Sequence, residues 1–386
     1  VKGVATEDGT LVMKVERTFR RLTCPRCGWK GRGRESAHRR RWRHLALWGT
    51  EVAIEAEIRR FLCRRCEAVV TEAVPWARHD SDFTRPFEDA VALLAQQTNR
   101  TAVAKLTGVA WVTVGKISER LVAERLDPDR LKNLRRIGID EISYRKRHKY
   151  LTIVTDHDTG TVVWAAEGKS GETLAAFFQM LGAEGCAAIE IATIDMSEAY
   201  EKAIREHLPN AKIAFDHFHI AKLANDALNE VRRELQREAE GDERAAIKGT
   251  RWPLAHRLEN VPEKYAEILE RIRPDAPLGR AYLLKEGLLD ILRRRPSSEL
   301  RLRDWLGWAA RSRIGPFVRL GRTIRSHLDG VLAFMKERLT NGLAEGMNNK
   351  IRLLSHRAYG FHSAASLIAT IYLCCAGITL PNLQLL

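Results

Sequence analysis

The sequence predicts a multidomain α+β protein, and three observations support this prediction. Its 386 residues exceed the roughly 250 to 300 at which a single hydrophobic core stops growing. Two CxxC pairs stand in the N-terminal part, where they favour a small metal-stabilised unit. A strand-and-helix pattern begins near Arg135 and is followed by a long helical stretch. With 45% hydrophobic and 29% charged residues, the composition excludes a disordered or fibrous chain.

Residues 1–77 hold four cysteines in two pairs: Cys24, Cys27, Cys63 and Cys66. A two-residue gap lets one tight turn present both thiolates to the same ion, so the pairs predict one tetrahedral, structural Zn²⁺. Residues 51–58 alternate in polarity, as expected of a half-buried strand. The pattern therefore predicts a zinc ribbon in which the metal replaces a core too small to form alone. Two redox pairs are the alternative, which is disfavoured because neither begins a helix of a βαβ unit.

Basic residues cluster in the same part of the chain. Between Arg17 and Arg65 there are 15 basic and four acidic residues, so this window carries +11 while the whole chain carries +15. A local excess of this size favours a nucleic-acid partner, because neutralising phosphates releases condensed counterions. A solvated basic face is the alternative. The expected DNA contacts here are Arg39, Arg40, Arg41 and Arg43.

Residues 78–134 are expected to form a helix-turn-helix domain. Ala104, Gly108 and Val114 fall at the spacing of a small contact residue, a turn glycine and an apolar anchor in the second helix. That second helix would begin near Trp111. A plain helical hairpin fits the same spacing, but the adjacent basic window favours DNA binding. The side chains expected to reach bases or phosphates in a major groove are Trp111, Thr113 and Lys116.

Residues 135–220 have the pattern of an RNase H-like α/β domain. Strands are expected at 137–144, 150–155, 161–166, 189–194 and 212–215, with helices at 172–181 and 197–207. Three antiparallel strands followed by alternating helices and strands are typical of that fold. Asp140 lies on the first strand and Asp195 ends the fourth, so we expect the two carboxylates side by side at the centre of the sheet.

Residues 221–336 predict an all-helical insertion into this fold. The stretch is rich in arginine and contains six prolines. It accounts for most of the 149 residues that separate Asp195 from Glu345, far more than an αβ connection needs. Its tryptophans are expected in the core, with stacking on an unpaired base as the alternative: Trp252, Trp305 and Trp308. The catalytic fold would be completed by residues 337–386, starting with a helix capped near residues 340–341.

Three acidic residues predict metal-dependent chemistry on phosphodiesters: Asp140, Asp195 and Glu345. Cutting and joining DNA strands requires an activated oxygen nucleophile, a stabilised leaving oxygen and relief of the phosphate charge. Two Mg²⁺ ions about 3.5 to 4 Å apart, which Mn²⁺ can replace, supply all three with few carboxylate ligands. On spacing alone, other acids are rival ligands: Glu141, Asp156 and Asp216.

The last of these acids stands on a helix with other groups suited to DNA. The side chains at i+3, i+4 and i+7 from Glu345 share its face, and they are Asn348, Asn349 and Arg352. Together with Lys350, these residues are expected to contact DNA beside the reacting phosphate.

Several stretches carry a family resemblance: IGIDEISYRKRHKY, TIDMSEAY, FDHFHIAK and LTNGLAEGMNNKIRLLSHRAYGF, after the ribbon CPRC…FLCRRC. They resemble the ISL-three family of bacterial insertion-sequence DDE transposases, in the same order and over nearly the whole chain. The resemblance implies that Asp140, Asp195 and Glu345 are the catalytic acids. Arg352 stands where related transposases often carry a basic residue near the DNA end. His217 departs from the family pattern, which leaves the role of its FDHFHIAK stretch open.

The resemblance implies an enzyme that binds terminal inverted repeats and performs strand cleavage and strand transfer on double-stranded DNA. Pairing two ends predicts at least a homodimer in the DNA complex. One alternative is a domesticated DNA-binding regulator with an inactive catalytic fold, and another is a structure-selective nuclease without strand transfer. We find no export leader and no apolar run of about 20 residues, so we expect a cytoplasmic, nucleoid-associated bacterial protein without a membrane partner.

Overall fold

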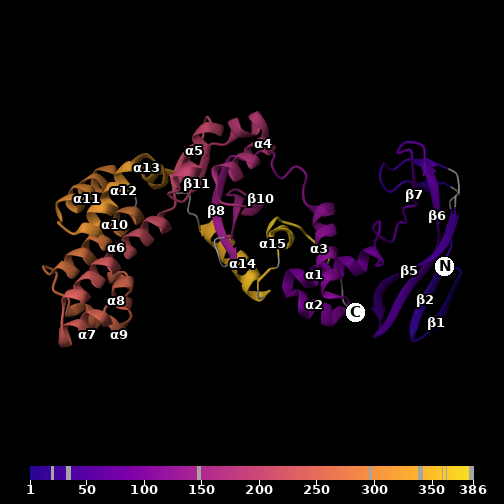
Figure 1. Ribbon diagram of the computed structural model, residues 1–386, viewed down its shortest axis with the longest axis horizontal. Coiled ribbons are helices and arrows are strands. Elements are labelled where there is room, and N and C mark those ends of the chain that lie inside the picture. Colours follow the sequence, from indigo (N-terminus) through magenta and orange to yellow (C-terminus); the bar gives the residue numbers. More distant parts are fainter. Residues whose placement is uncertain are drawn as a thin grey trace. The chain divides into compact units, whose positions relative to one another are not determined.

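The computed structural model describes residues 1–18, 21–31, 36–145, 149–294, 298–337, 342–358, 360–361 and 363–381, with only the backbone for residues 342–345. The chain divides into two compact units, residues 1–127 with 353–386 and residues 128–352 (Figure 1). The fold is a mixture of helices and strands, as the sequence predicts. The finer domain bounds expected from the sequence stay a prediction.

The first unit begins with a five-stranded sheet. Its strand order is β1 (Gly3–Glu7), β2 (Thr10–Val15), β6 (Thr50–Cys63) and β5 (Ser36–Leu47), while β7 (Ala68–Thr71) also pairs with β6. A separate hairpin consists of β3 (Leu22–Thr23) and β4 (Lys30–Gly31). The alternating residues 51–58 lie within β6, so the strand expected there is confirmed.

Three helices follow in the first unit: α1 (Arg85–Gln97), α2 (Arg100–Thr107) and α3 (Trp111–Arg125). Gly108 ends α2 at φ +65°, a left-handed conformation that glycine adopts without a steric penalty, and Val114 of α3 is fully buried. The expected turn glycine and apolar anchor are therefore confirmed. The second helix starts at Trp111, as predicted.

The C-terminal part of the chain packs on these helices. Helix α15 (Ala364–Cys375) places Leu373 in their core, and the Gln96 side chain donates a hydrogen bond to the carbonyl oxygen of Leu373 (2.8 Å). The Arg357 guanidinium, at the end of α14 (Gly342–Arg357), donates to the carbonyl oxygens of Ala95 and Gln96 (both 3.2 Å). Residues 353–386 are thus grouped with the first unit, and the assignment of residues 337–386 to the catalytic fold stays a prediction.

The second unit contains a five-stranded sheet of order β10 (Thr161–Glu167), β9 (Lys149–Asp156), β8 (Arg136–Arg145), β11 (Ile191–Ile194) and β12 (Lys212–Phe215). Strands β8 to β10 are antiparallel, and β11 runs parallel to both β8 and β12. Helices α4 (Gly171–Ala188) and α5 (Glu198–His207) pack beside the sheet (Figure 1). All seven elements expected here are present. Helix α4 is longer than predicted and has a break at Gly182 (φ +75°).

All secondary-structure elements among the described residues of the predicted insertion are helices. Its elements are α6 (His217–Glu238), α7 (Gly241–Gly249), α8 (Arg251–Ala255), η1 (Leu258–Asn260), α9 (Glu263–Glu270), α10 (Pro277–Arg293), α11 (Glu299–Arg311), α12 (Gly315–Ser326) and α13 (Leu328–Glu337). Trp305 is a core residue, as expected, and its Nε1 donates to the carbonyl oxygen of Leu284 (2.9 Å). The same expectation is wrong for Trp252 and Trp308, which are 62% and 41% exposed. Among the described helices, none combines the length and the apolar character needed to cross a membrane.

Candidate active site and zinc centre

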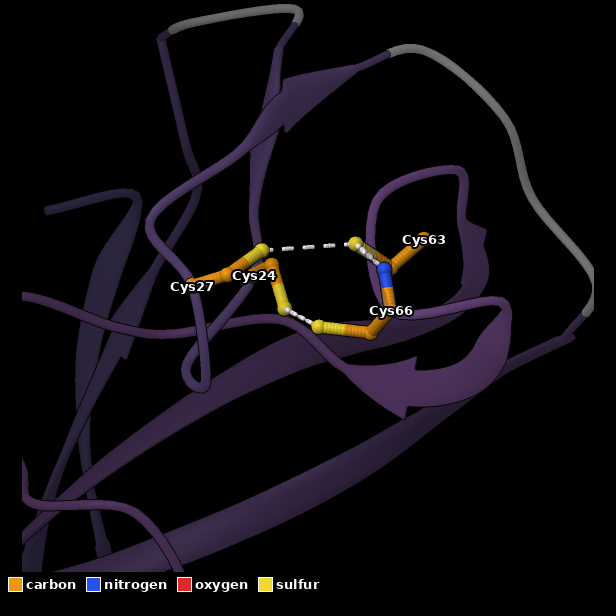
Figure 2. Close-up of side chains that lie close together, drawn as sticks. All are labelled: Cys24, Cys27, Cys63 and Cys66. Atoms are coloured by element: carbon orange, nitrogen blue, oxygen red, sulfur yellow. Dashed lines mark hydrogen bonds between the residues drawn. The ribbon is translucent and has the colours of Figure 1, made fainter.

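Four cysteine side chains converge at one end of the first sheet (Figure 2). Their Sγ atoms are 3.9 Å apart between Cys24 and Cys66 and 3.6 Å apart between Cys27 and Cys63. All four lie within 4.8 Å of one another. A tetrahedron with Zn–S distances of about 2.3 Å has S–S edges of about 3.8 Å. The cluster therefore has the size and the donor set that one zinc ion requires.

Two tight turns position the four cysteine side chains so that their sulfur atoms lie close together. The first pair lies in the turn between β3 and β4, where Gly28 has φ +71° and its N–H donates to the carbonyl oxygen of Cys24 (3.0 Å). The second pair lies between β6 and β7, where the backbone N–H of Cys66 donates to the Cys63 sulfur (3.4 Å). Apolar side chains surround the cluster, namely Leu22, Trp29, Phe61 and Val70.

The thiols differ in how readily they ionise. Burial opposes ionisation of Cys24, but hydrogen bonds from the backbone of Cys27 and Arg26 outweigh it and lower the pKa of Cys24 to about 7. The contact with Cys27, then burial and the other thiols, raises the pKa of Cys66 to about 12. A metal ion supplies the positive charge that lets all four thiolates form together, so metal binding and folding are coupled here.

In the second unit, two carboxylates stand on neighbouring strands. Strands β8 and β11 are parallel and adjacent, with Thr193 opposite Gly138, so Asp140 and Asp195 both stand two residues beyond that pair. The positions agree with the strand order predicted from the sequence. The catalytic role of both residues stays a prediction.

The environment of Asp140 favours a bound cation. Burial raises the pKa of Asp140 to about 6, and the negative charge of Asp195 adds to the rise. The backbone N–H of Glu141 opposes it by donating to Oδ1 of Asp140 (2.6 Å), and Nδ2 of Asn348 donates to Oδ2. Two acidic groups held close together in a partly buried place are stabilised when a cation lies between them.

The start of α6 adds two side chains to this site. Asp216 is the N-cap of α6, and its carboxylate accepts from the backbone N–H of Phe218 (3.0 Å). His219, in the first turn, places Nδ1 2.7 Å from Oδ1 of Asp195, and this contact raises the pKa of His219. One ligand atom from each of Asp195, Asp216 and His219 lies within 4.8 Å of the other two.

The sequence contained a signal for this cluster. Strands β11 and β12 are parallel neighbours, so residues just after their C-terminal ends lie at the same edge of the sheet. The D-x-x-H stretch from Asp216 to His219 follows β12 directly. That adjacency is the signal in the sequence that brings Asp216 and His219 to Asp195.

Helix α14 brings the remaining candidates. Asn348, expected as a DNA contact, is only 7% exposed and bonds to Asp140 instead. The side chain of Glu345 and the predicted helix start near residues 340–341 lie outside the described residues, so the structure places only the backbone of Glu345, one turn before Asn348. The other expected contacts on this helix are exposed, and they are Asn349, Lys350 and Arg352.

Two rival acids have other surroundings. Glu141 follows Asp140 on β8, so the two side chains point to opposite faces of the sheet. Burial raises the pKa of Glu141, while Lys169 and Tyr200 act against the rise. Asp156 is 7% exposed and accepts from the backbone N–H of Asp158 (2.9 Å) and the hydroxyl of Thr159 (2.8 Å), as expected of a turn residue.

The arginines expected to contact DNA lie on β5, and carboxylates pair with three of them. Arg40 pairs with Asp82 (2.9 Å), and Arg43 with Glu51 (2.7 Å). Arg41 lies between two carboxylates, those of Glu7 and Glu55. Arg39 is exposed and has no carboxylate within 4.0 Å among the described residues.

The start of α3 presents a different surface. Trp111 and Lys116 are exposed, and Thr113 is partly exposed. The Arg100 guanidinium lies over the Trp111 ring, 5.3 Å from its centroid. The helix therefore offers an aromatic, a hydroxyl and an ammonium group at its N-terminal end.

Comparison with known proteins agrees with this arrangement. A family model described as "Transposase", of the ISL3 type, matches residues 137–371. Residues 72–122 match the "Helix-turn-helix domain of transposase family ISL3", and residues 20–66 match the "zinc-finger of transposase IS204/IS1001/IS1096/IS1165".

Similar whole proteins carry the same kind of name. The "Transposase for insertion sequence element IS1557" of Mycobacterium tuberculosis is 40% identical, with 93% of this chain and 87% of that protein covered. The "Transposase for insertion sequence element IS1001" of Bordetella parapertussis is 30% identical, with 91% and 88% covered.

These matches confirm the predicted family and the predicted fold class, with its ribbon, helix-turn-helix and DDE-type domains. They indicate a DNA-binding transposase enzyme. The four-cysteine cluster and the ribbon match together support a structural zinc. The chain thus belongs to the ISL3 family of insertion-sequence transposases.

Proposed function

We propose that this transposase binds the terminal inverted repeats of its element and, with divalent cations, cleaves DNA strands and joins them to a target. Asp140, Asp195 and Glu345 would be its acidic residues. The observation that carries the proposal is the pair of carboxylates on adjacent parallel strands, with α14 held against the first of them through Asn348.

The donor set suits Mg²⁺ or Mn²⁺. Carboxylate oxygens are the ligands that these hard cations prefer, and Asp140 and Asp195 provide them on a partly buried surface where each raises the cost of the other's charge. When bound, two such ions supply an activated oxygen nucleophile and offset charge on the phosphate and on the leaving oxygen. Water and phosphate oxygens complete the coordination, so few protein ligands are needed.

The other polar residues of the site act by positioning. His219 holds Oδ1 of Asp195 at 2.7 Å, and Asn348 donates to Oδ2 of Asp140. The His219 contact fixes one oxygen of Asp195 and leaves the other for a cation. Both oxygens of Asp140 accept a hydrogen bond, from the Glu141 N–H and from Asn348, and each keeps a second lone pair for a cation. Because Asn348 is one turn from Glu345, the same hydrogen bond also sets the position of the helix that carries the third acid.

DNA recognition would divide between the two parts of the first unit. The exposed Arg39 and its neighbours on β5 would contact phosphates, which gives affinity without sequence preference. The N-terminal end of α3, with Trp111, Thr113 and Lys116, would enter a major groove and read base edges. Synapsis of two ends would require a homodimer in the DNA complex.

The decisive experiment is incubation of the purified protein with DNA that carries its own element ends and Mg²⁺, followed by mapping of strand ends. We expect a new 3′-hydroxyl at each end and its joining to target DNA. In Ca²⁺ the protein should bind the ends without cutting them. The Asp140→Asn protein should also bind, but its cleavage should fall by several orders of magnitude, because the substitution removes charge that holds the cations.

The outcomes separate this proposal from its alternatives. Specific binding of the ends without any cleavage in Mg²⁺ or Mn²⁺ would support a DNA-binding regulator instead. Cleavage that depends on branched structure, without end specificity or joining, would support a nuclease. Full cleavage by the Asp140→Asn protein would overturn the assignment of the acids.

A further inference from the structure

The helical insertion contains a small cavity that the chemistry described above does not use. Its volume is about 190 Å³, below the roughly 300 to 1,000 Å³ of sites for drug-sized ligands, so it suits a single ring system. Residues of α6 and α8 line it, among them Asn225, Asn229, Arg232, Arg251 and Trp252. The two helices are neighbours in Figure 1.

One side of this pocket has a buried arginine without an ion pair among the described residues, although the carboxyl group of Asp226 also belongs to the lining. Arg232 is only 6% exposed, yet its hydrogen bonds go to neutral amides, from Nε to Oδ1 of Asn229 (3.0 Å) and from Nη1 to Oε1 of Gln236 (2.8 Å). Its Nη2 has no partner among the described residues. Arginine is rarely buried without an ion pair, so this guanidinium is suited to an anion that arrives from outside.

The other side presents an aromatic ring. Trp252 is 62% exposed, and the Arg251 guanidinium lies over it, 5.2 Å from the ring centroid. No carboxylate lies within 4.0 Å of Arg251 among the residues that the structure describes. Asn225 places its Oδ1 in the interior without a donor among the described residues. The pocket thus combines a stacking surface, two guanidinium groups and a free amide acceptor, and with one carboxyl group, that of Asp226, its lining keeps a net positive charge.

The exposure of Trp252 is built into the fold, because α8 is firmly anchored. Lys285 is fully buried and donates from Nζ to the carbonyl oxygens of Leu254 (3.0 Å) and His256 (2.8 Å). The Tyr282 hydroxyl donates to the same carbonyl of His256 (3.2 Å). A short helix held in this way keeps its tryptophan in place, which lowers the entropic cost of binding a planar ligand.

We propose that this pocket is a subsite for one unstacked nucleotide of a DNA strand, with its base on Trp252 and its phosphate against Arg232 and Arg251. Every base has a π face that can stack on an aromatic side chain, and guanidinium groups match phosphate oxygens. A base can enter a concave pocket only after it leaves the duplex stack. The proposal rests on the proposed function, because it takes the ligand to be the strand being processed.

Helix α6 relates this pocket to the acidic site. His219, in its first turn, lies beside Asp195, and the helix continues to Asn225 and Arg232. At 1.5 Å per residue these positions are about 9 Å and about 20 Å further along the helix. At about 3.4 Å per nucleotide of a duplex strand, the flipped base should lie within about six nucleotides of the cleaved bond.

A crosslinking experiment tests this directly. 5-Iododeoxyuridine is placed at each of the six nucleotides on either side of the cleaved bond, one per duplex, and the complex is irradiated in Ca²⁺. We expect one position to crosslink to Trp252 of the full-length protein. The Trp308→Phe protein is the matched control, because Trp308 is an exposed tryptophan of the same insertion that does not line this pocket.

Activity provides the second measurement. Cleavage or joining by Trp252→Ala should fall about 10- to 100-fold, Trp252→Phe should retain most of it, and Trp308→Ala should be close to wild type. Arg232→Gln should be impaired as well, with an unchanged Tm confirming its fold. Crosslinks elsewhere but none to Trp252, or equal activity of Trp252→Ala and Trp308→Ala, would overturn the subsite. If the wild type binds and cuts no DNA ends, the proposed function itself fails, and this inference fails with it.

Discussion

The cysteine cluster and the acidic cluster are both candidate sets of metal ligands, yet they are assembled in opposite ways. Each cysteine pair comes from one turn, and all four sulfurs are buried or partly buried against apolar side chains. The acidic cluster takes Asp140 from β8, Asp195 from the end of β11, and His219 from the start of α6. Four thiolates close the coordination of a zinc ion, whereas a site with few carboxylates leaves positions open for water and phosphate.

The difference shows how each site depends on the fold. In a closed structural site the ligands determine the fold around them, because the protein is unstable without the metal. In an open site the fold positions the ligands, and their charges oppose one another until a cation arrives. Removing one ligand should therefore damage folding in the first case and chemistry in the second.

The largest effect is expected for the acids. Asp195→Asn and Glu345→Gln should each lower strand cleavage about 1,000-fold or more, because they remove charge where cations and a reacting phosphate must be held. Thermal unfolding should change little. Asp156→Asn is the matched control, since its amide oxygen can still accept from the Asp158 N–H while its amide NH₂ donates to the Thr159 hydroxyl, which can also accept. Single-turnover cleavage measures the effect. If Asp156→Asn lost as much cleavage activity as Asp195→Asn and Glu345→Gln, the assignment of the catalytic acids would be wrong.

The zinc ligands should behave in the opposite way. The Cys63→Ser protein should lose its one equivalent of zinc, and limited proteolysis should then cut residues 1–77 first while residues 128–352 stay protected, because zinc binding supplies the folding free energy of such small units. End-specific DNA binding should fall with the ribbon. Cys186→Ser serves as the control, since Cys186 is buried in the second unit, away from the cluster. Full zinc content in Cys63→Ser would refute the ligand set.

Features that depend on short spacings in the sequence were predicted, whereas contacts between distant elements were not. The cysteine pairs, the turn at Gly108 and the strand order around Asp140 depend on short spacings, and the structure contains all of them. Strands β1 and β2 were not foreseen, since no clear alternation marks residues 3–15. Nor was the packing of α15 on the helix-turn-helix, because an apolar helix does not specify which core it joins.

Contacts within the acidic site were also missed. Asn348 reaches Asp140 across 208 residues of chain, and His219 reaches Asp195 from a different element. No periodicity encodes such pairs, because they arise only when separate elements meet at the sheet edge. Asn348 was therefore assigned to the DNA, although in the structure it is buried against the carboxylate.

Positioning residues should have an intermediate effect. His219→Ala should lower cleavage about 10- to 100-fold at limiting Mg²⁺, because Asp195 loses the partner that orients it. Higher Mg²⁺ should restore part of the activity of His219→Ala. The activity of His219→Gln, which keeps an N–H donor, should lie between those of the wild type and His219→Ala. A purely structural role would lower activity equally at all Mg²⁺ concentrations and would shift Tm, which is the result that would contradict positioning.

The smallest effect is expected on the basic surface, where the structure sharpens a sequence prediction. The cluster from Arg39 to Arg41 was expected to contact phosphates as a group. Arg41 lies between Glu7 and Glu55, whereas Arg39 is exposed without a carboxylate partner among the described residues. A guanidinium already neutralised by two acids releases few counterions on binding DNA, so Arg39→Ala should weaken binding to all sequences alike and reduce the slope of log K against log salt by about one. Arg41→Ala should leave that slope nearly unchanged.

Binding isotherms at four salt concentrations, on an end sequence and on an unrelated duplex, measure both slopes. A larger change for Arg41→Ala would mean that its ion pairs open when DNA binds, and a change in sequence preference for Arg39→Ala would place base recognition on β5 instead of α3.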